Sequence, residues 1–266
     1  MSIQNLMDLS GRRSMITGAT GGLGTVIAET LAELGSDLIL IDRDKAEIEA
    51  LQSRLSDTFG VSVIGSECDL EQQDQREVLI DGIVSDGQEL NVLINNAAFV
   101  GTSNLPGWNA PFTEQSVETW RRALEVNLVA PFELCRGMSQ IMKHSRGANI
   151  INIASIYGQF GPDWRMYENT NMSNPAAYGA SKAGLIQLTK WLSTTLAPDV
   201  RVNAISPGGV FTGQPDDFVQ SYNSRTPLRR MATYDDLRGG VAYLATDMSE
   251  YVTGQVLNID GGWGVW

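Results

Sequence analysis

Residues 17–24 read Thr-Gly-Ala-Thr-Gly-Gly-Leu-Gly, and this stretch decides the fold class. The apolar run Ser14–Thr17 before it is typical of a buried strand, and apolar residues recur three and four apart after it as far as Gly35, as in an amphipathic helix. A glycine-rich turn between a strand and a helix lets the backbone approach a pyrophosphate at the positive end of the helix. No Lys-Ser/Thr follows the glycines, which excludes a P-loop. The stretch predicts a dinucleotide site with contacts from Gly18, Thr20, Gly21, Gly22, Leu23 and Gly24.

Further apolar segments alternate with helical patterns along the rest of the chain. The predicted strands are Ser14–Thr17, Asp37–Ile41, Val61–Glu67, Asn91–Ile94, Asn149–Ile153, Arg201–Ile205 and Val256–Ile259. A helix is predicted from Asp44 to Phe59, ending at Gly60. This order predicts an α/β, Rossmann-type, doubly wound fold with a mostly seven-stranded parallel sheet and helices on both faces. Because no linker divides the chain, we expect residues 1–266 to form a single dinucleotide-binding and catalytic domain.

Composition excludes several classes of function. A net charge of −12 argues against a nucleic-acid or anionic-membrane partner, and no run approaches the roughly 18 apolar residues of a membrane span. The two cysteines, Cys68 and Cys135, are too few for a disulfide framework and suggest a reducing cytoplasm. The single histidine, His144, lies in a polar stretch, so a Ser-His-Asp hydrolase and a histidine-rich metal site are disfavoured and no metal is expected.

The end of the second predicted strand bears on cofactor choice. Asp42 lies there, eighteen residues beyond Gly24. A carboxylate at this point can accept hydrogen bonds from ribose hydroxyls and repels a 2′-phosphate, which favours NAD over NADP. Arg43 follows directly and could meet such a phosphate, so NADP is the less favoured alternative, and a plain turn role for Asp42 is also open.

The segment Tyr178-Gly179-Ala180-Ser181-Lys182 begins a long helical pattern. Residues four apart share a helix face, so the phenol and the ammonium can point into the same space. Lowering a tyrosine pKa of about 10 by two or three units takes roughly 3–4 kcal/mol. One positive charge about 4 Å away supplies that much at an effective dielectric of about 20. The pair is thus a candidate acid/base, although the spacing alone also fits a surface pair.

Polar residues follow other predicted strands. Ser155 comes directly after the strand Asn149–Ile153, and Asn95-Asn96-Ala97-Ala98 follows the strand before it. Ligands of open α/β sheets bind at this carboxyl edge. Asn127 is a polar residue in an otherwise apolar helical stretch, which fits either a capping or core amide or a kink that holds a water.

Together these features resemble the short-chain dehydrogenase/reductase family, in its compact single-domain form, over essentially the full chain. The residues that carry the resemblance are Thr17–Gly24, Asp42, Cys68-Asp69-Leu70, Asn95–Ala98, Asn127, Ser155, Tyr178 with Lys182, and Pro207–Thr212. Ala98 departs from the pattern, which usually has glycine there. The segments Tyr167–Lys182 and Ser206–Pro215 are more weakly similar to oxidoreductases of bacterial surface-sugar and flagellin-glycan pathways.

The resemblance implies a catalytic tetrad of Asn127, Ser155, Tyr178 and Lys182. Ser155 would bond the substrate oxygen, Tyr178 would exchange its proton, Lys182 would bind the nicotinamide ribose and lower the Tyr178 pKa, and Asn127 would hold a relay water. It also implies contacts of Asp69 with adenine, of Asn96 and Ala97 with the adenosine ribose, and of Val210 and Thr212 with the nicotinamide amide. Further cofactor contacts are expected from Leu70, Ala98, Pro207 and Gly208. A homotetramer is implied, with a homodimer as the alternative.

The resulting expectation is hydride transfer between NAD and a secondary alcohol or ketone. One alternative is a sugar-nucleotide epimerase or dehydratase with retained NAD, because Gly21 and Gly22 fit the spacing of that branch, although the chain length and Asn95-Asn96-Ala97 favour the compact one. Another is a non-catalytic NAD-sensing protein, against which Tyr178 and Lys182 speak.

Two intervals, Asn95–Asn127 and Ser155–Tyr178, are longer than the family pattern. They carry flat aromatics among amides and charges, including Trp108, which suits a polar, sugar-like substrate. The substrate candidates are Tyr157, Trp164 and Tyr167, with loop packing or subunit contact as the alternative. Phe211–Thr233 lacks strong helix signals and is expected to form a lid. The C-terminal Trp263 and Trp266 are expected to be exposed and to form a self-association surface. The alternative is that they pack locally.

Overall fold

The computed structural model describes residues 2–100 and 103–266 and contains a seven-stranded sheet in the order β3-β2-β1-β4-β5-β6-β7. All six neighbouring pairs are parallel. The strands are β1 Arg13–Thr17, β2 Asp37–Asp42, β3 Val63–Glu67, β4 Val92–Asn95, β5 Asn149–Ile153, β6 Arg201–Pro207 and β7 Val256–Ile259. The predicted Rossmann-type sheet is therefore confirmed, with strand ends that differ from the predicted ones by at most two residues.

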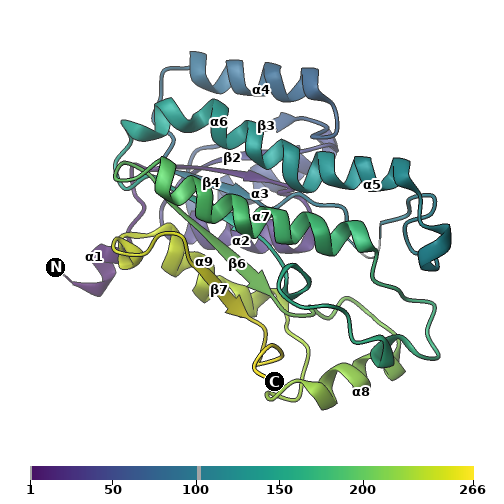
Figure 1. Ribbon diagram of the computed structural model, residues 1–266. Helices are drawn as coiled ribbons and strands as arrows, with labels where there is room; N and C mark the ends of the chain where they lie inside the picture. The colour runs from purple at the N-terminus through teal and green to yellow at the C-terminus, as the bar shows by residue number, and fades with distance from the viewer. Residues whose placement is uncertain (1, 101–102) are drawn as a thin grey trace.

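Helices connect the strands on both sides of this sheet (Figure 1). They are α1 Ile3–Met7, α2 Gly22–Glu33, α3 Lys45–Phe59, α4 Gln73–Ser85, α5 Val117–Leu124, α6 Ala130–Lys143, α7 Ala176–Thr195, α8 Asp216–Arg225 and α9 Arg238–Ala245. None of the described helices combines the length and the apolar character that crossing a bilayer requires.

Strand side chains alternate between two core layers. Ile16 and Leu40 belong to the layer that packs under α2, α3 and α9, whereas their neighbours Met15 and Ile39 belong to the layer under α4, α6 and α7. Successive strand residues point to opposite faces, so a sheet covered on both faces needs near-continuous apolar strands. This requirement explains why central strands such as β2 and β4 are mostly apolar and buried.

The strand order reverses between β1 and β4, which are neighbours although β2 and β3 lie between them in the chain. Connections from these two strands leave in opposite directions, so a crevice opens at their carboxyl ends. Thr17 ends β1 and Asn95 ends β4 at this crevice. The fold thus gathers residues from distant segments at one edge of the sheet.

Local capping confirms the second predicted helix, whose first helical residue is Lys45 rather than Asp44. The Asp44 carboxylate accepts hydrogen bonds from the backbone N–H groups of Ala46 and Glu47 and so caps α3. Gly60 ends the helix with a left-handed φ of 70°, a conformation that glycine adopts without strain.

Two expectations for the C-terminal third were wrong, the lack of a helix in Phe211–Thr233 and the exposure of Trp263, whereas the lid stays a prediction. The segment Phe211–Thr233 contains helix α8, which Figure 1 places near the C-terminus, away from the two main helix layers. Phe218 and Tyr222 lie four residues apart on its inner face and pack in one cluster with Trp263. Trp263 is accordingly 1% exposed, and of these two C-terminal tryptophans only Trp266 lies at the surface.

Candidate active site

The glycine-rich turn after β1 has no room for side chains at two positions. Gly18 has a φ of +64°, and a Cβ there would lie 2.8 Å from Cα of Ala97. A Cβ on Gly24 would collide with the carbonyl oxygen of Gly18. Gly21 stands at the N-cap of α2, where it has no side-chain oxygen to cap the helix. These positions leave backbone N–H groups at the helix end free for an anion, as a dinucleotide pyrophosphate requires.

Asp42 is held against this turn. Its Oδ2 accepts hydrogen bonds from the backbone N–H of Thr20 at 2.9 Å and from the Thr20 hydroxyl at 2.8 Å. Its Oδ1 accepts from the N–H of Arg43 at 2.8 Å. A carboxylate offers about four lone-pair sites, so acceptor capacity remains for a ribose hydroxyl. Asp42 therefore both braces the turn and presents negative charge at its edge.

Most of the predicted cofactor residues line one cleft of about 1210 Å³. Those that line it are Gly18, Thr20, Gly21, Leu23, Gly24, Asp42, Arg43, Asp69, Leu70, Asn96, Ala97, Ala98, Tyr178, Lys182, Pro207, Gly208, Val210 and Thr212. Gly22 does not line the cleft, because the ring of Tyr234 covers it. Asn96 Nδ2 donates to the carbonyl oxygens of Thr17 and Gly18, each at 3.0 Å, so its amide fastens the glycine turn.

Ser155 and Tyr178 line the same cleft from different elements. Ser155 follows β5, and its hydroxyl accepts a hydrogen bond from the N–H of Tyr157 at 3.2 Å. Tyr178 lies in the first turn of α7 and forms a hydrogen bond with the Ser155 hydroxyl. The sheet edge and the helix thus place the two hydroxyls in one cleft, and their catalytic roles stay predictions.

Lys182 lies one turn after Tyr178 and is 2% exposed. Its Nζ donates to the carbonyl oxygen of Ile153 at 2.6 Å and lies 5.9 Å from the centre of the Tyr178 ring. Burial lowers the pKa of Lys182 to about 8. The expected lowering of the Tyr178 pKa is not seen, because burial raises it and the hydrogen bond with Ser155 only partly opposes that rise.

Asn127 lies in a π-helical turn, Glu125–Val129, between α5 and α6. This turn agrees with the expected kink, and the buried amide of Asn127 agrees equally with the alternative of a core amide. Such bulges are frequent at functional sites. The side chain accepts from the N–H of Phe99 at 2.8 Å and donates to the Phe99 carbonyl at 3.1 Å and the Ser181 hydroxyl at 3.0 Å. Asn127 is buried behind the cleft rather than in its wall, and its water-holding role stays a prediction.

The predicted substrate residues are divided between two cavities. Tyr157 and Tyr167 line the cleft, where their hydroxyls lie 2.7 Å apart, and Asn174 Nδ2 donates to the Tyr167 hydroxyl at 3.4 Å. Burial raises the pKa of both phenols, so they are neutral hydrogen-bonding groups. Trp164 lines a neighbouring cavity instead. Trp108 is buried, with its indole N–H bonded to the Val100 carbonyl, so it supports a loop and does not face a substrate.

The contribution of α8, and of Met231 after it, was not predicted from the sequence. Phe218, Tyr222 and Met231 line the cleft, and the Tyr222 hydroxyl accepts a hydrogen bond from the N–H of Gly209 at 2.5 Å. The signal in the sequence was the spacing of Phe218 and Tyr222 behind two acidic residues, which is typical of a short amphipathic helix.

Comparison with known proteins identifies the family to which this site belongs. Residues 18–264 match the protein family described as enoyl-(acyl carrier protein) reductase. A tropinone reductase homolog of Arabidopsis thaliana is 32% identical over 273 residues, which span 100% of this chain and 97% of that protein. The chain belongs to the short-chain dehydrogenase/reductase family. Membership of this family supports an oxidoreductase that acts on alcohols or ketones.

Solved structures of this family superpose along nearly the whole chain. A gluconate 5-dehydrogenase from Burkholderia cenocepacia, in complex with NADP and tartrate, has a TM-score of 0.88 at 26% identity and covers 100% of both chains. An NAD+-bound xylitol dehydrogenase has a TM-score of 0.84 at 29% identity and covers 96% of this chain and 99% of its own. Relatives of this chain thus bind either nucleotide.

Proposed function

We propose that this chain is an NAD-dependent oxidoreductase that transfers a hydride between the nicotinamide and a secondary alcohol or ketone of polar, sugar-like character. The observation that carries the proposal is that Ser155 and Tyr178 line the same cleft as the glycine-rich turn and Asp42. A cofactor whose pyrophosphate lies at α2 and whose nicotinamide reaches these hydroxyls would span that cleft. The cleft residues fit a dinucleotide, since the glycine turn admits close approach of a phosphate.

The chemical step needs a proton at the substrate oxygen and a group that orients this oxygen. In the direction of reduction, the Ser155 hydroxyl hydrogen-bonds the ketone oxygen, and the Tyr178 hydroxyl gives it a proton as the carbonyl carbon gains a hydride. In the direction of oxidation, Tyr178 takes the proton back from the alcohol. The nicotinamide, when bound, supplies the hydride for reduction and accepts it in oxidation.

Lys182, which also lines the cleft, supports this exchange. Burial lowers the pKa of Lys182 to about 8. Because burial also raises the pKa of Tyr178, the protonated phenol is the dominant form at neutral pH. The phenol is therefore ready to act as an acid, which suits ketone reduction. In this geometry Lys182 holds α7 against the end of β5 through Ile153, and its remaining N–H groups are suited to a nicotinamide ribose.

The proposed preference for NAD rests on Asp42. Its carboxylate is fixed beside Thr20 at the place where the adenosine ribose would lie. A fixed negative charge there disfavours a 2′-phosphate through Coulomb repulsion and leaves an acceptor for the hydroxyls of NAD. The exposed side chain of Arg43, next to Asp42, is the group that a 2′-phosphate would meet, and NADP is the less favoured nucleotide.

The polar substrate character rests on the cluster of Tyr157, Tyr167 and Asn174. Two neutral phenols and one amide converge on the cleft beside Ser155, where they can donate to and accept from hydroxyl groups. Charged side chains are not needed for such contacts. This supports a hydroxylated substrate whose reacting carbon faces Ser155 and Tyr178.

We also propose that the protein works in the cytoplasm as a homotetramer or homodimer. Both cysteines are free and buried, which suits a reducing compartment. The helices α5 and α6 expose the large apolar side chains of Val117, Trp120 and Phe132. Apolar groups of this size at the surface are typical of subunit contacts. Light scattering after size exclusion would measure the assembly.

Turnover of NADH tests the function directly. The purified protein should change NADH absorbance with at least one member of a panel of polyols, aldoses, steroids and acyl ketones. Tyr178→Phe should abolish this turnover while leaving NADH binding nearly unchanged, because only the transferable proton is lost. Tyr251→Phe, at a fully exposed position, is the matched control. Unchanged turnover in Tyr178→Phe would remove the mechanism.

The same assay separates the two alternative functions. An epimerase or dehydratase would retain its NADH during turnover and would need a UDP- or GDP-linked ligand. A sensor would bind NADH without turning over any member of the panel. Released product nucleotide in stoichiometric amounts supports the oxidoreductase and contradicts both alternatives.

A further inference from the structure

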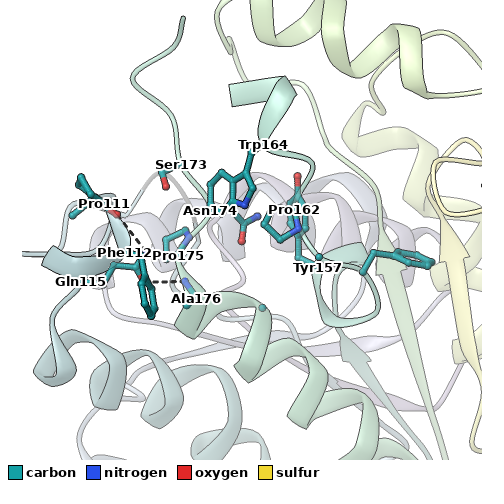
Figure 2. Close-up of a pocket in the computed structure, with 14 residues that line it drawn as sticks. Pro111, Phe112, Gln115, Tyr157, Pro162, Trp164, Ser173, Asn174, Pro175 and Ala176 are labelled. Atoms are coloured by element: carbon teal, nitrogen blue, oxygen red, sulfur yellow. Dashed lines mark hydrogen bonds between the residues drawn. The ribbon is translucent and has the colours of Figure 1, made fainter. Parts of the chain in front are cut away.

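A second cavity of about 600 Å³ lies beside the reaction cleft. Tyr157, Ser173, Asn174 and Pro175 line both spaces, so the two meet along the segment that leads into α7. Figure 2 shows Pro111 and Phe112 on one side of this second cavity and Pro162 and Trp164 on the other, with Asn174 and Pro175 between them. Its position places it next to the substrate candidates Tyr157 and Tyr167 and apart from the predicted cofactor residues.

Most of the wall of the second cavity comes from two connecting segments, the one between β4 and α5 and the one between β5 and α7. Ala110–Gln115 belongs to the first, and Phe160–Pro175 belongs to the second. Hydrogen bonds join the two segments, from Asn109 Nδ2 to the Asn171 carbonyl at 3.0 Å and from the Ala176 N–H to Gln115 Oε1 at 3.1 Å. The cavity is therefore formed mainly by these two connecting segments, with the start of α7 closing one side.

The chemistry of the walls selects the ligand. None of the described residues that line the cavity carries a charged side chain. A carboxylate or phosphate placed there would lose water without gaining a counter-charge, which is strongly unfavourable. Proline rings and the faces of Phe112 and Trp164 instead offer flat apolar surfaces, and both side chains are more than half exposed and so accessible.

Two polar groups lie at the inner side of the cavity. Asn174 is 8% exposed, and its amide reaches the Tyr167 hydroxyl in the reaction cleft. Ser173 contributes a hydroxyl next to it. An occupant can therefore carry a small number of neutral hydrogen-bonding groups on the side that faces the cleft, while its remaining surface is apolar.

We infer that the second cavity binds a neutral, flat ring carried by the substrate beyond its reacting carbon. This inference rests on the proposed function and narrows its substrate class: the reacting end is an alcohol or ketone at Ser155 and Tyr178, and the far end is an uncharged ring between Trp164 and Phe112. Free anionic substrates such as sugar acids, which lack this ring, are then poor ligands.

Binding of three simple ketones tests the inference without relying on turnover. Benzylacetone carries a phenyl ring, butanone has no ring, and levulinate has a carboxylate in place of the ring. With NADH present and Tyr178→Phe as the background, calorimetry should show that benzylacetone binds about ten-fold more tightly than the other two, because only its ring gains apolar burial.

A variant that fills the second cavity is the decisive test. Gly161 lines the cavity, and a Cβ there meets no atom within 4 Å, so Gly161→Leu places a side chain in the space without a backbone clash. Gly161→Leu should remove the preference for benzylacetone. Gly82→Leu, where a Cβ also meets nothing within 4 Å, makes the same change on α4 and should leave the preference intact. Trp164→Ala, which enlarges the cavity at an exposed position, should also weaken the binding of benzylacetone.

The outcomes separate this inference from the proposed function. Equal affinity for the three ketones, or a preference that survives Gly161→Leu, overturns the ring-binding cavity whatever the enzyme assay shows. If the ring preference depends on Gly161 but the wild type turns over no alcohol or ketone, the cavity stands and the proposed function fails. Thermal unfolding within a few degrees of the parent protein excludes misfolding of Gly161→Leu as the cause.

Discussion

Lys182 Nζ donates a hydrogen bond of 2.6 Å to the carbonyl oxygen of Ile153. Ile153 is the last residue of β5, and Ser155 follows it by two positions. The bond therefore fixes the helix that carries Tyr178 against the strand that delivers Ser155. It also leaves a buried ammonium, whose pKa is lowered to about 8 from 10.5 by burial.

This buried ammonium predicts a pH-dependent stability. Between pH 8 and pH 10.5 the unfolded chain holds a proton on Lys182 that the folded chain has released, so the wild type gains stability as the pH rises through this window. Lys182→Met lacks this gain. Urea unfolding should show that the wild type improves relative to the variant by on the order of 3 kcal/mol across the window.

Lys190→Met, on the exposed side of the same helix, is the control for Lys182→Met. Because it retains Lys182, its free energy of unfolding should rise with pH as that of the wild type does. A stability difference between Lys182→Met and wild type that stays constant from pH 8 to pH 10.5 would contradict the assignment.

Asp42 predicts the nucleotide preference. Replacing Asp42 by Asn keeps an oxygen that can accept from Thr20 but removes the charge that repels a 2′-phosphate. Asp42→Asn should shift the ratio of kcat/KM for NADH to that for NADPH toward NADPH on the order of ten-fold. Asp42→Ala should shift the ratio in the same direction and should also weaken both nucleotides, because the turn loses its brace. An unchanged ratio in both variants would refute the proposed role.

Asn127 is predicted to stabilise the fold, although it does not line the cleft. Asn127→Ala removes the side-chain partners of both the N–H and the carbonyl of Phe99. Each buried group left unpaired costs about 1–3 kcal/mol, so the free energy of unfolding should fall by about 2 kcal/mol or more. Ser181→Ala removes the third bond of Asn127 and the bond from the Ser181 hydroxyl to the Tyr178 carbonyl, but it leaves both partners of Phe99 in place and should cost less. Equal stability of Asn127→Ala and wild type in urea unfolding would show that this network does not hold the π-helical turn.

Trp263 predicts a link between the C-terminus and the cleft. Its ring lies 6.1 Å from that of Tyr157 and 6.4 Å from that of Tyr222, and the Arg225 guanidinium lies 4.4 Å from it. Trp263→Ala should lower stability by about 3 kcal/mol and should raise the substrate KM more than it lowers kcat, because α8 and Tyr157 lose their common support. Trp191→Ala, at an exposed position of α7, should do neither. Similar effects of the two variants would argue against a positioning role.

The sequence by itself determined the sheet, the glycine turn and the pairing of Tyr178 with Lys182. These features are recorded locally. Apolar runs such as Asn149–Ile153 reflect burial on both faces of a strand, glycines mark backbone positions without room for a Cβ, and a spacing of four residues sets one face of a helix. The carboxyl edge of the sheet also followed, because parallel strands bring their ends to the same side.

Only the tertiary structure decided how the distant segments meet. Three features depend on contacts between residues far apart in the chain: the burial of Trp263 against α8, the division of Tyr167 and Trp164 between two cavities, and the meeting of Ala110–Gln115 with Phe160–Pro175 around the second cavity. The raised pKa of Tyr178 has the same origin, since desolvation depends on everything packed around the phenol and not on its neighbours in sequence.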